Sequence, residues 1–197
     1  MSRIEGRFII PNIVTGINMF FGFVSIAMAM KGEFQKAGLF ILFAIISDGA
    51  DGKLARMLNG FSDFGKEFDS FSDAVSFGVA PSILIYSILR DINVIRELII
   101  PASFLFLLCS VLRLVKFNIT TMPSKEKSDF IGMPTPTAAG LIASYVVFCY
   151  KVFGQIKYVN VFIFLALICP LIMISTIRFK NILKTFRKTN VWVIIIL

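Results

Sequence analysis

Long apolar stretches alternate with short polar connectors along most of this chain. Each stretch approaches the ~20 apolar residues that an α-helix needs to cross a bilayer. The connectors are rich in turn residues and charges, as expected for loops at the membrane surface. The pattern predicts an all-α integral membrane protein, a single domain over residues 1–197, with six spans at 9–30, 37–58, 68–89, 97–118, 136–153 and 158–179.

The composition supports this prediction. Hydrophobic residues make up 57% of the chain and charged residues 16%, against about 45–50% and about 25% in soluble domains. A water-soluble monomer is excluded, because so few polar residues cannot cover the surface. The absence of histidine excludes histidine-based acid–base chemistry and metal ligation. The three cysteines stand singly in apolar runs and predict neither a disulfide framework nor a zinc site.

The net charge of +8 bears on topology. In a soluble protein such a charge would suggest binding to nucleic acid. Here it is better explained by the orientation of the protein in the membrane and by contact with anionic membrane lipids. No nucleic-acid partner is therefore expected. Most basic residues fall at the N-terminus, in the second and fourth connections and in the C-terminal tail. The positive-inside rule therefore predicts a cell-membrane protein with both termini, and any active site at those connections, in the cytoplasm. The opposite side carries Lys31, Lys36, Arg90, Arg96, Lys151 and Lys157.

Candidate chemistry is concentrated in four aspartates on or beside the second and third spans. An ionisable residue inside a span costs about 2.5–3.5 kcal/mol, so such a set is hard to retain without a function. Asp48 and Asp51 are three residues apart and Asp69 and Asp73 four apart, so each pair shares a helix face. A turn at 58–62 would bring the two pairs together. Converging carboxylates need a cation, and oxygen ligands suit Mg²⁺, Mn²⁺ or Ca²⁺ rather than zinc.

Neighbouring residues add to this picture and also supply an alternative. Gly52 and Gly65 lack a Cβ and would let a bulky substrate approach, although each glycine alone is better explained by helix packing or turn geometry. Arg56 is placed to meet a phosphate with two parallel hydrogen bonds. The alternative is that the aspartates form intramembrane salt bridges with Lys53, Arg56 and Lys66.

These positions form one pattern that matches, at every fixed position, the signature of the CDP-alcohol phosphotransferases. The resemblance implies a membrane enzyme of six spans with a cytoplasmic site for two divalent cations. In such enzymes an alcohol attacks a CDP-linked donor and CMP is released. The pattern reads Asp48-x2-Asp51-Gly52-x2-Ala55-Arg56-x8-Gly65-x3-Asp69-x3-Asp73.

Four flanking stretches resemble the membrane-bound phosphatidylserine synthases within that family. This likeness implies CDP-diacylglycerol as donor and L-serine as acceptor, and we expect a homodimer. Family members often carry a second arginine where this chain has Lys116. The stretches are Pro11-Asn12-x2-Thr15-x2-Asn18, Phe77-Gly78-Val79-Ala80-Pro81, Arg113-Leu114-x-Lys116-Phe117-Asn118 and Phe130-x-Gly132-x-Pro134-x-Pro136.

The resemblance also implies roles for individual residues. The four aspartates of the signature would hold the cations, and Asp73 would also accept the proton of the serine hydroxyl. The residues expected to bind the CDP-lipid are Asn12, Thr15, Gly52, Ala55, Arg56, Ser62 and Gly65, with Asn12 and Thr15 reaching the cytosine ring.

Serine carries a carboxylate, so its pocket needs a cation. Arg113 and Lys116, at the cytoplasmic end of the fourth span, are the candidates, and Asn118 would add a hydrogen bond. The alternative is that both basic residues merely anchor the span at the interface.

Two other functions stay open at this point. A sister enzyme would use glycerol phosphate or an inositol phosphate and should need several arginines. A divalent-cation transporter would use the aspartates as a transit site, but it has no need of Arg56 or the paired glycines.

Overall fold

The computed structural model describes residues 6–57, 62–92, 96–120, 130–176 and 178–179. They are helical almost throughout, as predicted, apart from one short antiparallel ladder that pairs Phe130 with Phe179 and Ile131 with Arg178. The elements are α1 (Gly6–Met30), α2 (Phe34–Met57), α3 (Asp63–Asp73), the π-helix η1 (Ala74–Val79), α4 (Ala80–Asp91), α5 (Arg96–Thr120), β1 (Phe130–Ile131), α6 (Thr135–Phe153), α7 (Val159–Ile174) and β2 (Arg178–Phe179).

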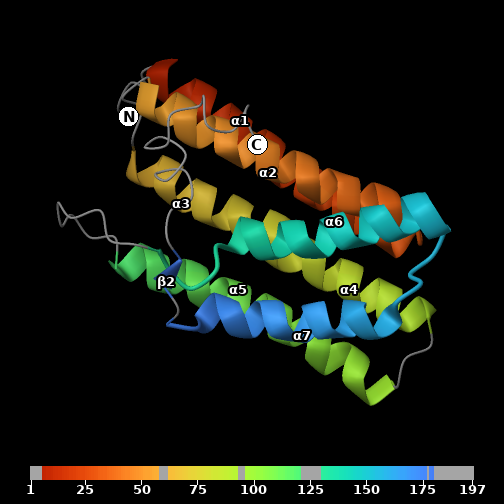
Figure 1. The fold of residues 1–197 in the computed structure, drawn as a ribbon. Helices are drawn as coiled ribbons and strands as arrows, with labels where there is room; N and C mark the ends of the chain where they lie inside the picture. The colour runs from red at the N-terminus through yellow and green to blue at the C-terminus, as the bar shows by residue number, and fades with distance from the viewer. Residues whose placement is uncertain (1–5, 58–61, 93–95, 121–129, 177, 180–197) are drawn as a thin grey trace, which may run out of the picture.

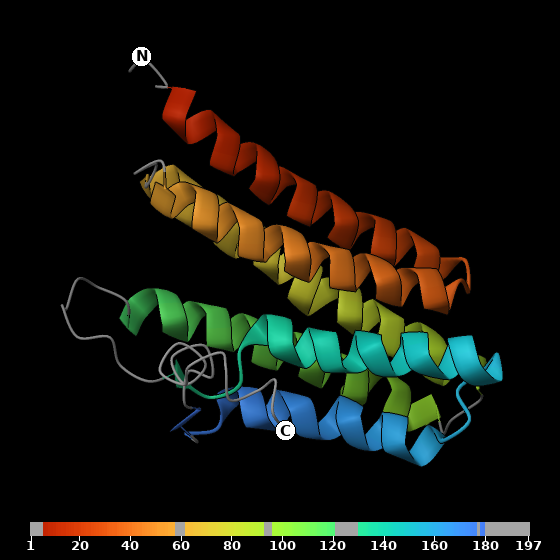
Figure 2. The same cartoon turned by 45° about the horizontal axis from the view of Figure 1, so that its top comes forward.

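The helices form a bundle in which successive rods run in opposite directions (Figures 1 and 2). α3, η1 and α4 follow one another without a break and form a single rod. One end of the bundle gathers the last turns of α2 and α5 and the first turns of α3 and α6. We call it the aspartate end, because Asp48, Asp69 and Asp73 lie there. The opposite end, with the connections around residues 31–33 and 154–158, is called the turn end.

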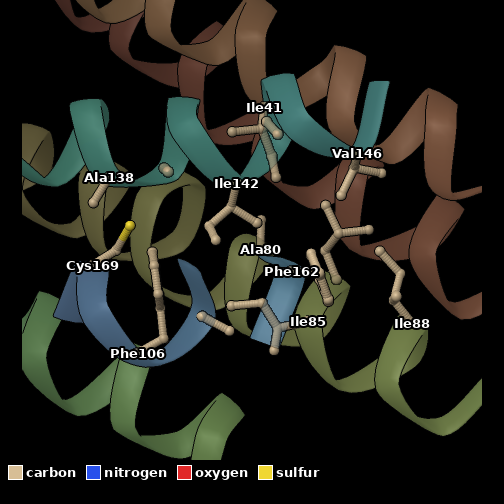
Figure 3. Packing of buried hydrophobic residues seen from close by; sticks show 14 of the residues in the cluster. Ile41, Ala80, Ile85, Ile88, Phe106, Ala138, Ile142, Val146, Phe162 and Cys169 are labelled. Atoms are coloured by element: carbon tan, nitrogen blue, oxygen red, sulfur yellow. The ribbon is translucent and has the colours of Figure 1, made fainter. Parts of the chain in front are cut away.

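The α3–η1–α4 rod is the centre of the bundle. In an apolar 18-residue stretch of Asp63–Asp91, 61% of the residues are buried, whereas 28%, 33% and 33% are buried in the corresponding stretches of α1, α5 and α6. In the core, side chains of α4, the last part of this rod, interdigitate with side chains of α2, α5, α6 and α7 (Figure 3). The core residues labelled in Figure 3 are Ile41, Ala80, Ile85, Ile88, Phe106, Ala138, Ile142, Val146, Phe162 and Cys169.

Small residues let neighbouring helices approach closely. A Cβ built on Gly38 of α2 would lie 2.9 Å from Val147 Cγ2 and 3.1 Å from the Ala143 carbonyl oxygen on α6. Without a hydrophobic force between helices in lipid, such close backbone approach is a main source of helix association. α2 and α6 are therefore held in a defined contact beside the core.

Within the described part of the chain, four helical segments are long and apolar enough to cross a membrane. The other two predicted spans correspond to α2, which carries Lys36, Asp48 and Asp51, and to α7, which is 16 residues long. The protein is a multi-pass helical membrane protein, and the number six stays a prediction. The four segments are Pro11–Met30, Asp63–Asp91, Glu97–Ile119 and Thr135–Phe153.

The third rod begins earlier than the hydropathy pattern indicates. The expected span was 68–89, but the helix starts at Asp63 and runs to Asp91. Its N-terminus is capped by Ser62, whose Oγ accepts a hydrogen bond from the Gly65 amide at 3.0 Å. The first turns of α3 are polar, and hydropathy alone therefore could not identify them as helix. Most of the expected turn, 58–61, lies outside the described residues.

Candidate active site

Three carboxylates from two helices meet at the aspartate end. Asp48 lies near the end of α2, and Asp69 and Asp73 lie one turn apart on α3. One carboxylate oxygen from each residue lies within 4.8 Å of the other two, and all three residues are half-buried. The structure thus brings together three of the four aspartates of the signature. The side chain of Asp51 lies outside the described residues.

This arrangement fits a hard divalent cation. Three like charges that gather in a half-buried site repel one another unless a cation compensates them. Carboxylate oxygens around Mg²⁺ or Ca²⁺ bind at about 2.0–2.6 Å, so ligands of one ion lie within a few ångströms of each other. The salt-bridge alternative would draw the aspartates toward separate cations. Lys53 and Lys66 are exposed, and the side chain of Arg56 lies outside the described residues. The convergence of the carboxylates therefore favours a metal site.

Asp73 also contacts a residue to which the sequence motifs assigned no role. Asn18 of α1 is fully buried, and its Nδ2 donates to Asp73 Oδ1 at 3.4 Å. Its Oδ1 is buried and has no hydrogen-bond partner. The one available signal was the position of Asn18 in the first flanking motif, three residues after Thr15 and hence on the same helix face.

Two serines join α1 to the rod that carries Asp73. Ser72 Oγ donates to the Thr15 carbonyl oxygen at 3.0 Å, and Ser76 Oγ donates to the Asn18 carbonyl oxygen at 2.9 Å. Gly22 permits this approach, because a Cβ there would lie only 2.8 Å from Ser76 Cα. The π-helical turn begins immediately after Asp73, and such turns occur frequently at functional sites.

Some expected CDP-lipid residues meet where α1 approaches the first turn of α3. A Cβ on Gly65 would lie 3.0 Å from Ser62 Oγ and 3.2 Å from Asn12 Oδ1. The missing side chain therefore makes room for two other residues of the expected site, which differs from the expectation that it makes room for substrate. Thr15 is buried, and its hydroxyl donates to the Pro11 carbonyl oxygen at 3.1 Å.

The remaining expected CDP-lipid residues lie at the end of α2. Gly52 is exposed, whereas the side chains of Ala55 and Arg56 lie outside the described residues. Contacts of the nucleotide with any of these residues stay predictions.

The three expected serine-binding residues have different surroundings. Arg113 is half-buried, donates from Nη1 to Thr135 Oγ1 at 2.9 Å and interacts electrostatically with Asp73. Its Nε is buried without a hydrogen-bond partner. Asn118 Nδ2 donates to Ser70 Oγ at 2.9 Å and so joins α5 to α3, whereas Lys116 is exposed. Arg113 therefore joins α5 to α6 and lies within electrostatic reach of Asp73.

Thr135 is a second residue that sequence reasoning did not single out. It is fully buried at the start of α6, between the two prolines of the fourth flanking motif. Its spacing from Arg113 along the chain carries no signal, because the two residues are brought together only by the packing of α5 and α6.

The CDP-alcohol phosphatidyltransferase family matches residues 8–172, which include every described residue of this site. The chain belongs to this family. It is therefore a transferase, and the transporter alternative has no remaining support. Family membership accords with divalent-cation dependence, to which the three converging carboxylates correspond.

Among its relatives, this CDP-alcohol phosphatidyltransferase is similar to three enzymes of known name. The CDP-diacylglycerol–serine O-phosphatidyltransferase of Helicobacter pylori is 34% identical over 195 residues, covering 98% of this chain and 81% of the relative. The archaetidylserine synthase of Methanothermobacter thermautotrophicus is 38% identical over 146 residues, 73% of this chain and 60% of the relative. The CDP-diacylglycerol–serine O-phosphatidyltransferase of Bacillus subtilis is 38% identical over 142 residues, 72% of this chain and 77% of the relative.

Proposed function

We propose that this enzyme transfers the phosphatidyl group of CDP-diacylglycerol to the hydroxyl of L-serine, which forms phosphatidylserine and releases CMP. The observation that carries the proposal is the position of Arg113, a half-buried cation that interacts with Asp73 at the carboxylate cluster. An acceptor with a carboxylate as well as a hydroxyl matches this pair of groups. Relatives from bacteria and an archaeon share serine in their names while their lipids differ, which supports serine as the acceptor.

Asp48, Asp51, Asp69 and Asp73 would hold two divalent cations, with Mg²⁺ or Mn²⁺ as the first candidates and Ca²⁺ as a third. When bound, such ions neutralise the pyrophosphate and the charge that develops on departing CMP. The proposal assigns this task to the four carboxylates, of which those of Asp48, Asp69 and Asp73 converge on one point.

Asp73 is proposed as the proton acceptor. The serine oxygen forms a bond to the lipid-side phosphorus, the bond from this phosphorus to the CMP oxygen breaks, and the hydroxyl proton passes to a carboxylate oxygen of Asp73. General-base assistance of this kind typically contributes about 10²–10⁴-fold in rate. The guanidinium of Arg113, which interacts electrostatically with Asp73, lies beside the group proposed to accept the proton.

The CDP-lipid is proposed to lie between the start of α3 and the end of α2. Asn12, Ser62 and Gly65 meet at the N-terminus of α3, where the helix dipole favours phosphate. Gly52, Ala55 and Arg56 on α2 and Thr15 on α1 would complete this side of the site. The serine carboxylate would bind Arg113, with Lys116 and Asn118 farther along the same helix.

We further propose that the aspartate end faces the cytoplasm and that the single domain assembles as a homodimer. The start of α1 and the end of α7 lie at the aspartate end (Figures 1 and 2). The excess of basic residues in the segments assigned to this side supports the orientation. Cysteine-accessibility labelling in intact cells tests the orientation, and cross-linking in membranes tests the dimer.

The test of the function is CMP release from CDP-diacylglycerol by the purified protein with Mg²⁺ or Mn²⁺ and a panel of alcohols. L-serine is expected to support release, and the lipid product should carry a free amine. Glycerol phosphate and inositol phosphate serve as competing acceptors. Release with a phosphorylated acceptor but not with serine would contradict the proposal and favour the sister enzyme.

A further inference from the structure

Asn18 holds an unusual position in the packing of α1 against the central rod. It is fully buried, its amide nitrogen contacts Asp73 Oδ1, and its own oxygen has no partner. The orientation of the amide follows from its neighbour, because the reversed rotamer would place its oxygen against a carboxylate oxygen. The amide nitrogen of Asn18 therefore binds Asp73, whereas its amide oxygen has no hydrogen-bond partner.

Stability of the fold does not explain the asparagine. A buried polar atom without a partner is unfavourable, and an apolar side chain of similar size would avoid it. The contact between α1 and the rod is already provided by the hydrogen bonds of Ser72 and Ser76 to carbonyl oxygens of α1 and by the close approach at Gly22. What Asn18 adds to this contact is the hydrogen bond to Asp73.

We propose that Asn18 is a positioning residue whose amide fixes the rotation of the Asp73 carboxylate. This inference rests on the proposed function, in which one carboxylate both ligates a cation and accepts a proton, so that each oxygen must point in its own direction. Asn18 is fully buried, so we expect it to act on the reaction through Asp73. It is itself held in place, because Ser76 Oγ binds its carbonyl oxygen at 2.9 Å.

Asn18→Leu tests the proposal, because leucine has a similar size and cannot donate to Asp73. Loss of an outer partner of a metal-ligating side chain typically costs about 10–100-fold in activity or metal affinity. We expect kcat per folded molecule to fall by this factor, while the KM for CDP-diacylglycerol stays unchanged. Mn²⁺ binding, followed by electron paramagnetic resonance without substrate, should weaken as well.

Ser25→Ala is the matched control. Ser25 is a fully buried residue of α1 whose Oγ donates to the Ala37 carbonyl oxygen on α2 at 2.9 Å, away from the aspartates. Its replacement removes a buried hydrogen bond between helices and should leave kcat and Mn²⁺ affinity unchanged. An equal loss of kcat in both variants would overturn the proposal, since it would show that α1 packing alone matters.

A second variant covers the case in which Asn18→Leu does not fold. Asn18→Asp retains the shape but replaces the donor with a carboxylate oxygen facing Asp73, and it should reduce kcat at least as strongly. Wild-type kcat in either folded variant overturns the positioning role. If the unmodified protein releases CMP with serine, such a result leaves the proposed function standing. If it does not, the proposed function and this inference both fail.

Discussion

The two ends of the bundle satisfy their polar groups in different ways. At the turn end, partners come from the same short segment. Glu33 Oε2 lies 2.5 Å from Lys36 Nζ, and Lys157 Nζ lies 4.7 Å from the centre of the Phe153 ring. Gly154 closes α6 in the left-handed conformation, with φ of 71°. Each of these interactions links residues a few positions apart.

At the aspartate end, partners come from distant parts of the chain. Asn18 donates a hydrogen bond to Asp73, and Arg113 donates one to Thr135, and each bond joins two different helices. Asn18 Oδ1 and Arg113 Nε are nevertheless buried without hydrogen-bond partners, and three carboxylates converge. Glu33 Oε2 at the turn end is buried too, but the charge of Lys36 lies beside it. The polar interactions of the turn end therefore stabilise the fold, whereas the polar groups of the aspartate end are arranged to bind ligands.

Removal of divalent cations should have the largest effect. Since the carboxylates of Asp48, Asp69 and Asp73 converge, EDTA is expected to abolish CMP release, and Mg²⁺ or Mn²⁺ should restore it. Helix content, measured by circular dichroism in the same samples, should change little because the turn end and the core need no ion. Full turnover in the chelator would contradict the metal assignment.

Asp73→Asn should have the next largest effect. The amide keeps an oxygen ligand but loses the charge and basicity, so kcat should fall by at least about 10²-fold while CDP-diacylglycerol still binds. Asp91→Asn at the turn end is the matched control, because Asp91 is an exposed aspartate that ends the same rod. Equal rates in the two variants would remove the functional distinction between the ends.

Arg113→Ala tests the acceptor site. Loss of a charge-assisted hydrogen bond costs about 1.5–3 kcal/mol, which corresponds to about a tenfold to hundredfold higher KM for serine. The KM for CDP-diacylglycerol should change much less, and Arg113→Lys should recover only part of the loss. If Arg113 were only an interfacial anchor, Arg113→Lys would behave like the unmodified protein and Arg113→Ala would lower only the amount of inserted protein.

Thr135→Val should have a smaller effect of the same kind. Valine matches the shape of threonine but cannot accept the hydrogen bond of Arg113 Nη1. Thr135 acts on serine only indirectly, by orienting Arg113, so we expect an effect of the size of a typical net hydrogen bond, about 0.5–1.5 kcal/mol, or about a twofold to tenfold rise in the KM for serine. Thr135→Ser should behave like the unmodified protein, and Thr137→Val, at an exposed position of the same helix, should be silent. A silent Thr135→Val would separate Thr135 from the acceptor site.

Glu33→Gln at the turn end should have the smallest effect. The hydrogen bond and the charge of Lys36 lower the pKa of Glu33, so the stabilising effect of the pair is present at neutral pH and is lost as the pH falls through this lowered value. Exposed pairs of this kind contribute little. Unchanged turnover and nearly unchanged thermal stability at pH 7 are expected, and a large loss of turnover would show that the turn end is not purely structural.

Much of the fold and part of the site followed from the amino-acid sequence. The apolar stretches predicted the helices because burying a backbone in lipid requires every peptide group to bond within its own helix. The spacing of Asp69 and Asp73 predicted that they share a face, since residues four apart are neighbours on any α-helix. The polar start of α3 escaped the same reasoning because it is helical without being apolar.

The spacing of residue types along the chain was enough to predict the helices, the two pairs of aspartates that share a helix face, and the family signature. Which helix faces contact each other is known only from the tertiary structure. It brings Asp48 close to Asp69 and Asp73, and it brings Asn18 to Asp73 across 55 positions of the chain. Such contacts depend on where two helices cross, and that point is set by close approaches such as Gly22 against Ser76. Helical geometry is a property of each segment, whereas a crossing point is a property of the two surfaces that pack together.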